Sequence, residues 1–375
     1  MIRILQFVNT LGCNNGMMSV IMNYYRHIDR SKVQFDFLYY SERENNYISE
    51  IEELGGKIYK LNYSSNLLKV KKGFERFFKQ EKGKYKVMQI HSLMFARLIR
   101  SAAEKNGIEH MILHIHATKY SAKPINNFLD EILCFNIDKV SNELFACSLL
   151  AAEYAYSKKS IRTGKVRILN NAIECDDFKF VKDKRRRIRE ELGIPEEDVI
   201  VGAIGRLTKA KNHTFLIGVF SEYIKRYPNS HLVIAGEGPL YDELMEKIEG
   251  YSLQDNVHLL GLRKDVPDIL ASFDVFILPS TSAEGFPVSV VEAEVSGLPC
   301  IIADSVTKEV DIICCEFVSL KGGIDKWCDT ICSMVDKAKS IDRKMAYKTI
   351  EDAGYDIREE AKKLCDYYLN LSIEA

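Results

Sequence analysis

The sequence lacks the roughly 18 consecutive apolar residues that a membrane-spanning helix requires. Its N-terminus, MIRILQFVNT, has no long apolar stretch and no small-residue cleavage site, so we expect a β-strand there and not a signal peptide. The 10 cysteines include no C-x-x-C pair, which argues against structural zinc and against a disulfide framework. These absences predict a cytoplasmic protein with reduced cysteines.

Proline is scarce and low-complexity tracts are absent, with 8 prolines among 375 residues. The chain is 46% hydrophobic and 28% charged, which is the composition of a soluble globular protein. A chain of this length is expected to form about two domains, each large enough to bury a core.

The net charge of −1 conceals two halves of opposite sign. Residues 1–170 hold 26 Lys and Arg against 16 Asp and Glu, a net of +10, and the remainder has a net of −11. A basic first half indicates an anionic partner. The densest basic stretch, Lys69–Lys86, interleaves lysines with Phe74, Phe77 and Phe78. It predicts either a solvated helix face or a contact with an anionic membrane surface; no nucleic-acid-binding module accompanies the charge, so we expect no nucleic-acid partner.

Short apolar strands alternate with helices, and the pattern restarts after about residue 173. Such alternation predicts an α/β fold of two Rossmann-like, doubly wound domains that face an interdomain cleft containing the site. We expect an N-terminal domain over residues 1–172 and a C-terminal domain over residues 173–355. The strands are expected at residues 2–8, 34–40, 57–61, 87–90, 111–116, 145–148 and 165–169, and then at 199–205, 231–235, 257–260, 275–278 and 299–303.

Residues 279–300, PSTSAEGFPVSVVEAEVSGLPC, place Glu284 and Glu292 eight positions apart. Pro287 suits the first turn of a helix, so the segment reads as a strand, a short loop and a helix. The free amides at that helix start (Val288, Ser289 and Val290) and the helix dipole favour a phosphate. A glutamate beside a phosphate makes sense if it binds sugar hydroxyls, whereas two solvated glutamates at a surface helix are the alternative.

A second motif, GRLTKAKNH, follows the fully apolar strand at residues 199–205. Gly205 ends the strand, and the cations Arg206 and Lys211 then stand five positions apart. An arginine fork and a lysine point charge are complementary ligands for a diphosphate. Two fixed cations and a helix start can replace a metal ion electrostatically, so we predict no metal and no cofactor.

The N-terminal domain offers two weaker signals. Gly16 closes the turn Gly12–Gly16 after the first strand. His114 and His116 share one side of a strand end, and His91 ends the preceding strand. Buried histidines in such places are more often structural than functional.

The E-x7-E spacing with EGFP, the GRL-x-x-x-K-N-H form and the H-x-H pair resemble the retaining GT-B glycosyltransferases of family 4, in particular the bacterial capsule and exopolysaccharide branch. The resemblance implies that Glu284, with the amides of Gly285 and Phe286, holds the donor sugar, and that Glu292 accepts hydrogen bonds from the ribose. It also implies a C-terminal helix, residues 357–371, that crosses back to the first domain. The residues expected to take part in transfer are His116, Arg206, Lys211 and Glu284. Those expected against the donor are Gly16, Gly205, Arg263, Gly285, Phe286, Val288, Ser289 and Glu292.

The resemblance implies transfer of a hexose from a nucleotide diphosphate sugar, UDP-linked by expectation, in surface polysaccharide synthesis. The acceptor would be a glycan or a polyprenyl-diphosphate-linked oligosaccharide, and the enzyme would be cytoplasmic or peripheral at the inner face of the cell membrane. Three alternatives remain open: a nucleotide-sugar epimerase of the same fold, sugar transfer to a non-lipid acceptor such as a small metabolite, and a non-catalytic nucleotide-sugar-binding partner in an assembly complex.

Overall fold

The computed structural model describes residues 1–13, 15–62, 66–116, 132–141, 143–281 and 284–373. They form two compact units. Unit 1 consists of Met1–Ala172 with Ile357–Ala375, and unit 2 consists of Ile173–Asp356. Each unit contains its own parallel sheet.

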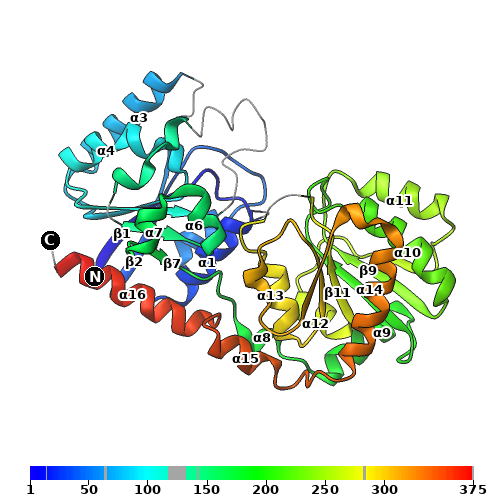
Figure 1. The fold of residues 1–375 in the computed structure, drawn as a ribbon. Helices are drawn as coiled ribbons and strands as arrows, with labels where there is room; N and C mark the ends of the chain where they lie inside the picture. The colour runs from blue at the N-terminus through cyan, green and yellow to red at the C-terminus, as the bar shows by residue number, and fades with distance from the viewer. Residues whose placement is uncertain (14, 63–65, 117–131, 142, 282–283, 374–375) are drawn as a thin grey trace. The chain divides into compact units, whose positions relative to one another are not determined.

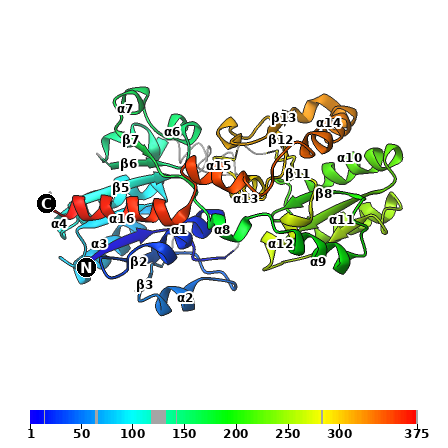
Figure 2. The same cartoon turned by 90° about the horizontal axis from the view of Figure 1, so that it is seen from below.

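The sheet of unit 1 has seven parallel strands in the order β3-β2-β1-β4-β5-β6-β7. Helices cover both faces: α3 packs with α4 on one face, and α1 packs with the C-terminal α16 on the other (Figures 1 and 2). The strands are β1 (Ile2–Phe7), β2 (Val33–Tyr39), β3 (Ile58–Lys60), β4 (Val87–Ile90), β5 (His110–Ile115), β6 (Glu143–Ala146) and β7 (Val166–Ile168). The described helices are α1 (Gly16–His27), α2 (Ile48–Glu53), α3 (Leu67–Gln80), α4 (Ala96–Lys105), α6 (Leu149–Ala155), α7 (Lys158–Arg162) and α16 (Ile357–Ile373).

The sheet of unit 2 has six parallel strands in the order β10-β9-β8-β11-β12-β13. Its helices α10 and α14 pack together, and Trp327 of α14 is fully buried between them and the sheet. The strands are β8 (Val199–Ile204), β9 (Ser230–Ala235), β10 (Val257–Leu259), β11 (Val275–Leu278), β12 (Cys300–Ala303) and β13 (Cys315–Val318). The helices are α8 (Cys175–Phe178), α9 (Lys182–Leu192), α10 (His213–Arg226), α11 (Tyr241–Gly250), α12 (Val266–Ser272), α13 (Val288–Val295), α14 (Gly323–Ala338) and α15 (Ala346–Asp352).

Two parallel, doubly wound sheets confirm the predicted fold class. The strands expected from sequence are present with ends that differ by at most two residues, and β13 is the strand that was not expected. β13 lies at the edge of its sheet, and of its four residues, CEFV, only Val318 is buried. An edge strand of this kind lacks the continuous apolar run from which a buried parallel strand is predicted.

The basic segment after residue 66 forms α3, and its three phenylalanines are buried in unit 1. Phe74 packs edge-on against Phe7 of β1 at 5.1 Å between ring centroids, and Phe77 packs against Tyr59. The idea that these rings contact a membrane is therefore wrong, because they belong to the core. The lysines and two leucines at the start of α3, Leu67 and Leu68, remain exposed. Among the described residues, no helix has both the length and the apolar character needed to cross a membrane.

Candidate active site

Each sheet reverses its direction of winding at one point, and the motif residues follow the strands at these points. In unit 2, β8 lies between β9 and β11. The GRL motif follows β8, and Glu284 lies in the loop after β11. In a doubly wound sheet, ligands bind beyond the carboxyl ends of the strands where the order reverses. The topology thus places both motifs where a ligand site is expected.

Hydrogen bonds join the loops after β8, β9 and β11. The amide of Leu207 donates to the Glu237 carbonyl at 2.9 Å, and that of Thr281 donates to the Ala210 carbonyl at 2.8 Å. Gly236 has φ +149°, and a Cβ there would stand 2.0 Å from the Gly205 carbonyl oxygen. Only glycine permits this approach, so the three loops meet in one rim at the edge of the sheet.

Lys211 and Glu284 meet on this rim. Lys211 Nζ lies 2.8 Å from Glu284 Oε2, and both side chains are about one-fifth exposed. The Lys211 stem runs past Gly205, where an added Cβ would stand 3.4 Å from Lys211 Cε. Such a Cβ would only touch the lysine stem, and it is the φ of +152° that favours glycine at residue 205.

The second oxygen of Glu284 is an unused acceptor. Glu284 Oε1 is buried and has no hydrogen-bond partner among the described residues. Buried carboxylate oxygens normally accept at least one hydrogen bond, so this atom is suited to accept a hydrogen bond from a hydroxyl group of a ligand.

Glu292 stands on α13 and is partly buried. This burial raises the pKa of Glu292 from its ordinary value of 4.5 to about 7, although the nearby charge of Lys211 acts to lower it. Poor solvation raises the free energy of an ionised carboxylate, and carboxylates with pKa values raised in this way are concentrated at functional sites.

The start of α13 offers fewer free amides than expected. Pro287 occupies the N-cap, one position before the helix, and the Val290 amide already donates to the Pro287 carbonyl at 3.2 Å. The prediction that Val290 contributes a free donor is therefore wrong. The amides of Val288 and Ser289 have no acceptor among the described residues, and both residues are partly exposed.

Gly285 and Phe286 are buried beside this helix start. The Phe286 ring stacks on Tyr355 with centroids 5.2 Å apart and an interplanar angle of 11°. The Phe286 ring is thus used in packing within unit 2. A contact of this residue with a donor sugar would therefore be made by its backbone.

The two expected arginines differ in their surroundings. Arg206 is exposed and forms no ion pair with a described residue. Arg263 is held by Asp265 at 2.7 Å and by Glu191 at 2.6 Å, and these carboxylates raise its pKa. The guanidinium of Arg263 is therefore engaged in local structure, and its contact with a base stays a prediction.

In unit 1, Gly16 begins α1 after Asn15. Asn15 has φ −119° and caps the helix by accepting a hydrogen bond from the Met18 amide at 3.3 Å. Asn15 is therefore an extended N-cap residue. A Cβ on Gly16 would meet nothing within 4 Å, so the space above it is open.

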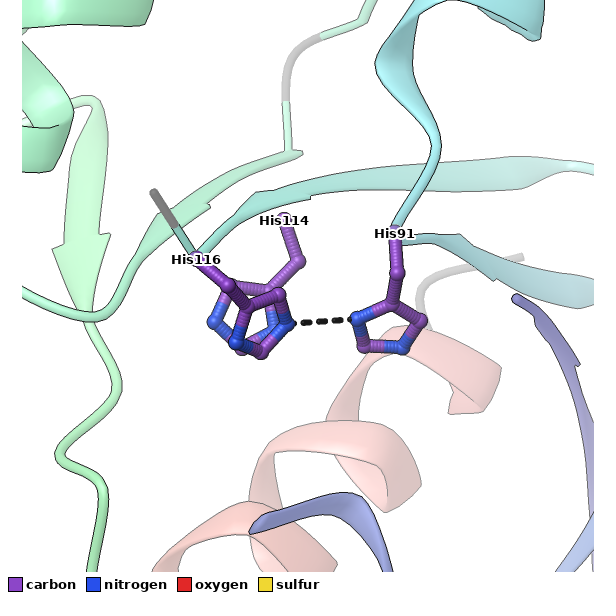
Figure 3. A group of neighbouring side chains, drawn as sticks. All are labelled: His91, His114 and His116. Carbon is purple, nitrogen blue, oxygen red and sulfur yellow. Dashed lines mark hydrogen bonds between the residues drawn. The ribbon is translucent and has the colours of Figure 1, made fainter. Parts of the chain in front are cut away.

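Three histidines gather at the carboxyl ends of β4 and β5 (Figure 3). His91 Nδ1 lies 2.7 Å from His116 Nε2, and the rings of His114 and His116 have centroids 3.9 Å apart. Burial lowers the pKa of His116 to about 3, and it lowers the pKa values of His91 and His114 well below the usual range. All three rings are therefore neutral at physiological pH.

Two glutamines complete this cluster and were not expected from sequence. Gln6 Oε1 lies 2.9 Å from His91 Nε2, and Gln89 Nε2 lies 2.9 Å from His114 Nδ1. Both are buried, in strands that are otherwise apolar apart from Arg3 of β1. A buried amide in such a strand is the signal that could have revealed them.

Comparison with known proteins agrees with these motifs. A family model described as glycosyl transferases group 1 matches residues 184–324. The putative glycosyltransferase EpsF of Bacillus subtilis is 31% identical over 367 residues, which cover 96% of this chain and 94% of EpsF. An Escherichia coli UDP-Gal:alpha-D-GlcNAc-diphosphoundecaprenol alpha-1,3-galactosyltransferase is 25% identical over 78% of this chain and 77% of its own.

Among solved structures, Anabaena HepE in complex with UDP and glucose has the same fold. It superposes with a TM-score of 0.78 over 98% of this chain and 99% of its own, at 15% sequence identity. The motifs, the two doubly wound sheets and the full-length similarity to EpsF agree, and the chain belongs to the group 1 glycosyltransferases, the GT-B family 4.

Proposed function

We propose that this glycosyltransferase transfers a hexose from a UDP-sugar, with retention of anomeric configuration, to a glycan or polyprenyl-diphosphate-linked acceptor in bacterial surface polysaccharide synthesis. The observation that carries the donor assignment is the rim of unit 2, where Lys211, Glu284 and the start of α13 meet beyond β8 and β11. The solved complexes of HepE with UDP support a uridine nucleotide. The acceptor class is supported by the galactosyltransferase named for a diphosphoundecaprenol-linked sugar.

The ion pair between Lys211 and Glu284 changes partners in this proposal. Lys211, with exposed Arg206 and the amides of Val288 and Ser289, neutralises the diphosphate. Glu284 is released and directs its carboxylate, together with the amides of Gly285 and Phe286, to the hydroxyls of the donor sugar. Gly205, beside the Lys211 stem, holds the backbone of this loop at φ +152°.

The remaining donor contacts divide between the ribose, the base and the sugar. Glu292 accepts hydrogen bonds from the ribose hydroxyls, and Arg263 lies near the base. From unit 1, the domain that we propose for the acceptor side, Gly16 permits close approach of the diphosphate, and His116 contacts the donor sugar.

The reaction on this proposal breaks the bond between the anomeric carbon and the phosphate oxygen, and forms the bond to the acceptor oxygen on the same face. The proton of the acceptor hydroxyl passes to the leaving diphosphate. Fixed cations and helix amides stabilise the negative charge that develops on that diphosphate. No divalent metal is needed for this charge, and no cofactor takes part.

A lipid-linked acceptor would bring the enzyme to the inner face of a membrane as a peripheral protein. The exposed lysines of α3 and its exposed Leu67 and Leu68 suit an anionic surface. The buried phenylalanines of the same helix take no part in that contact.

Calorimetric titration with UDP, GDP and ADP, each in EDTA and then in Mg²⁺, tests the donor site. We expect micromolar binding of UDP in EDTA with little change in Mg²⁺, and release of UDP from a UDP-hexose only when an acceptor is present. An absolute need for Mg²⁺ would contradict metal independence. Conversion of a UDP-sugar without acceptor would favour the epimerase, and nucleotide binding without any turnover would favour the non-catalytic partner.

A further inference from the structure

The three imidazoles of unit 1 are brought together by strand register. β4 and β5 are parallel with Ile90 opposite Leu113, so His91 follows β4 at the level of His114. His116 lies two residues beyond His114, on the same side of the strand. One ring nitrogen from each histidine lies within 4.8 Å of the other two, and Figure 3 shows the three rings gathered in one place.

The hydrogen bonds of the cluster leave two ring nitrogens without partners. Gln6 Oε1 can only accept, so it takes the Nε2 proton of His91, whose Nδ1 then carries a lone pair. His116 Nε2 donates to that lone pair, and His116 Nδ1 is left as an acceptor with no partner. His114 Nε2 is likewise buried without a partner, on a side chain that is 1% exposed.

The unpartnered His114 Nε2 requires an explanation at this depth, and a shared ligand supplies one; His116 Nδ1 has no described partner with or without that ligand. We propose that His91, His114 and His116 bind a borderline transition-metal ion such as Zn²⁺. The ligand atoms would be His91 Nδ1, His114 Nε2 and His116 Nε2. The ion takes the place of the proton between His91 and His116, whose nitrogens separate from 2.7 Å to about 3.3 Å, the spacing set by tetrahedral bonds of roughly 2.0–2.1 Å.

The two glutamines lie against the ring nitrogens of His91 and His114 that would not bind the ion. Metal-binding histidines donate their second ring N–H to an acceptor, which fixes the tautomer and the ring orientation. Gln6 already accepts from His91 Nε2. At present the Tyr368 hydroxyl donates to Gln89 Oε1, and Gln89 Nε2 faces His114 Nδ1. Half a turn of the Gln89 amide exchanges the two atoms, so that the oxygen accepts from His114 Nδ1 and the nitrogen donates to the Tyr368 hydroxyl.

The three imidazole nitrogens determine which class of metal ion the site would bind. Three neutral imidazoles suit Zn²⁺, Co²⁺, Ni²⁺ and Cu²⁺, whereas Mg²⁺ and Ca²⁺ require oxygen ligands. The site therefore differs from a diphosphate-bound Mg²⁺, and three protein ligands leave a fourth position open for water or a ligand oxygen.

Occupancy would also affect transfer, a consequence that rests on the proposed function. His116 is the residue proposed to contact the donor sugar, and an ion bound to its Nε2 withdraws that nitrogen. Zn²⁺ is then expected to inhibit transfer while UDP binding in unit 2 persists.

Titration of the full chain with Co²⁺ or Zn²⁺ after EDTA treatment and its removal tests the site. We expect one ion per chain, with a Co²⁺ visible spectrum that lacks thiolate-to-metal bands. His91→Ala and His116→Ala should each weaken binding at least about ten-fold, and Gln6→Ala should weaken it about 10- to 100-fold. His110→Ala is the matched control, because His110 lies on the same strand but contacts Glu143 instead, at 3.7 Å; it should bind as the parent does.

Three results would overturn the metal site: no stoichiometric ion, binding unchanged in both His91→Ala and His116→Ala, or a thiolate spectrum that places the ion on cysteines. Melting curves of each variant confirm that a loss of binding does not come from unfolding. Binding without inhibition would keep the metal site and overturn the assignment of His116 to the donor sugar.

Discussion

Replacing Glu292 with glutamine should stabilise the protein in a pH-dependent way. Burial raises the pKa of Glu292 from 4.5 to about 7, so the folded state favours the protonated carboxyl. This favourable contribution is fully present below about pH 4.5 and is lost as the pH rises through about 7. At pH 8 the ionised carboxylate destabilises the folded state by about 3 kcal/mol relative to the unfolded chain.

Glutamine has no charge to bury, so Glu292→Gln removes that cost. We expect the burial of the Glu292 charge to contribute little to the difference in free energy of unfolding between variant and parent at pH 4.5. By pH 8 the variant should gain up to about 3 kcal/mol in free energy of unfolding relative to the parent. Urea unfolding at several pH values measures the difference, with Glu249→Gln at the exposed end of α11 as the control for loss of one acidic group. A difference that stays flat from pH 4.5 to 8 would refute the reasoning.

The same substitution should weaken UDP binding, because an ionised carboxylate accepts from both ribose hydroxyls and a carboxamide does not. The parent should bind UDP more weakly at pH 6 than at pH 8, as Glu292 becomes protonated. The variant should lose this dependence on pH. Calorimetry at the two pH values separates the outcomes, and an unchanged affinity in the variant would remove Glu292 from the ribose site.

Three further perturbations test other parts of unit 2. Lys211→Met should lower kcat on the order of 10²-fold, which steady-state rates of UDP release measure; near-parental turnover would contradict the role of Lys211 in neutralising the diphosphate. The substitution should also raise the pKa of Glu292 further, because the Lys211 charge lowers that pKa. Glu294→Ala should destabilise the protein by about 3 kcal/mol in urea unfolding, since Glu294 Oε1 accepts from the amides of Ile312, Ile313 and Cys314. Glu294→Gln keeps an acceptor oxygen and should cost less, and equal losses would show that these hydrogen bonds are not the cause. Gly236→Ala should disrupt the rim and UDP binding because its Cβ would stand 2.0 Å from the Gly205 carbonyl, whereas Gly250→Ala meets nothing within 4 Å and should bind UDP normally.

The sequence predicts the fold well where burial is complete. β8 and β11 are continuous apolar runs, and their positions were expected almost to the residue. β13 was not expected, because an edge strand needs less apolar character. The burial of Phe74, Phe77 and Phe78 could have been predicted, since with Val70 they follow helical spacing on one face; the surrounding lysines obscured it.

The candidate site is predictable residue by residue but not as a set of contacts. The motifs identified Lys211 and Glu284 separately, and their ion pair depends on three loops that meet only in the folded sheet. The glutamines beside the histidines have the same limitation, because Gln6 and Gln89 are brought level by the register of β1 and β4. Contacts across strands require a register, which a single sequence does not state.

The division of unit 1 into two segments has a consequence for synthesis on the ribosome. Unit 2 is continuous and can fold as soon as residue 356 has emerged, whereas unit 1 must wait for α16, which closes it with the fully buried Tyr368. Until then, the apolar surface of α1 and of the sheet that α16 covers is unprotected. A released chain that is truncated before residue 357 would therefore carry a complete unit 2 attached to an aggregation-prone unit 1.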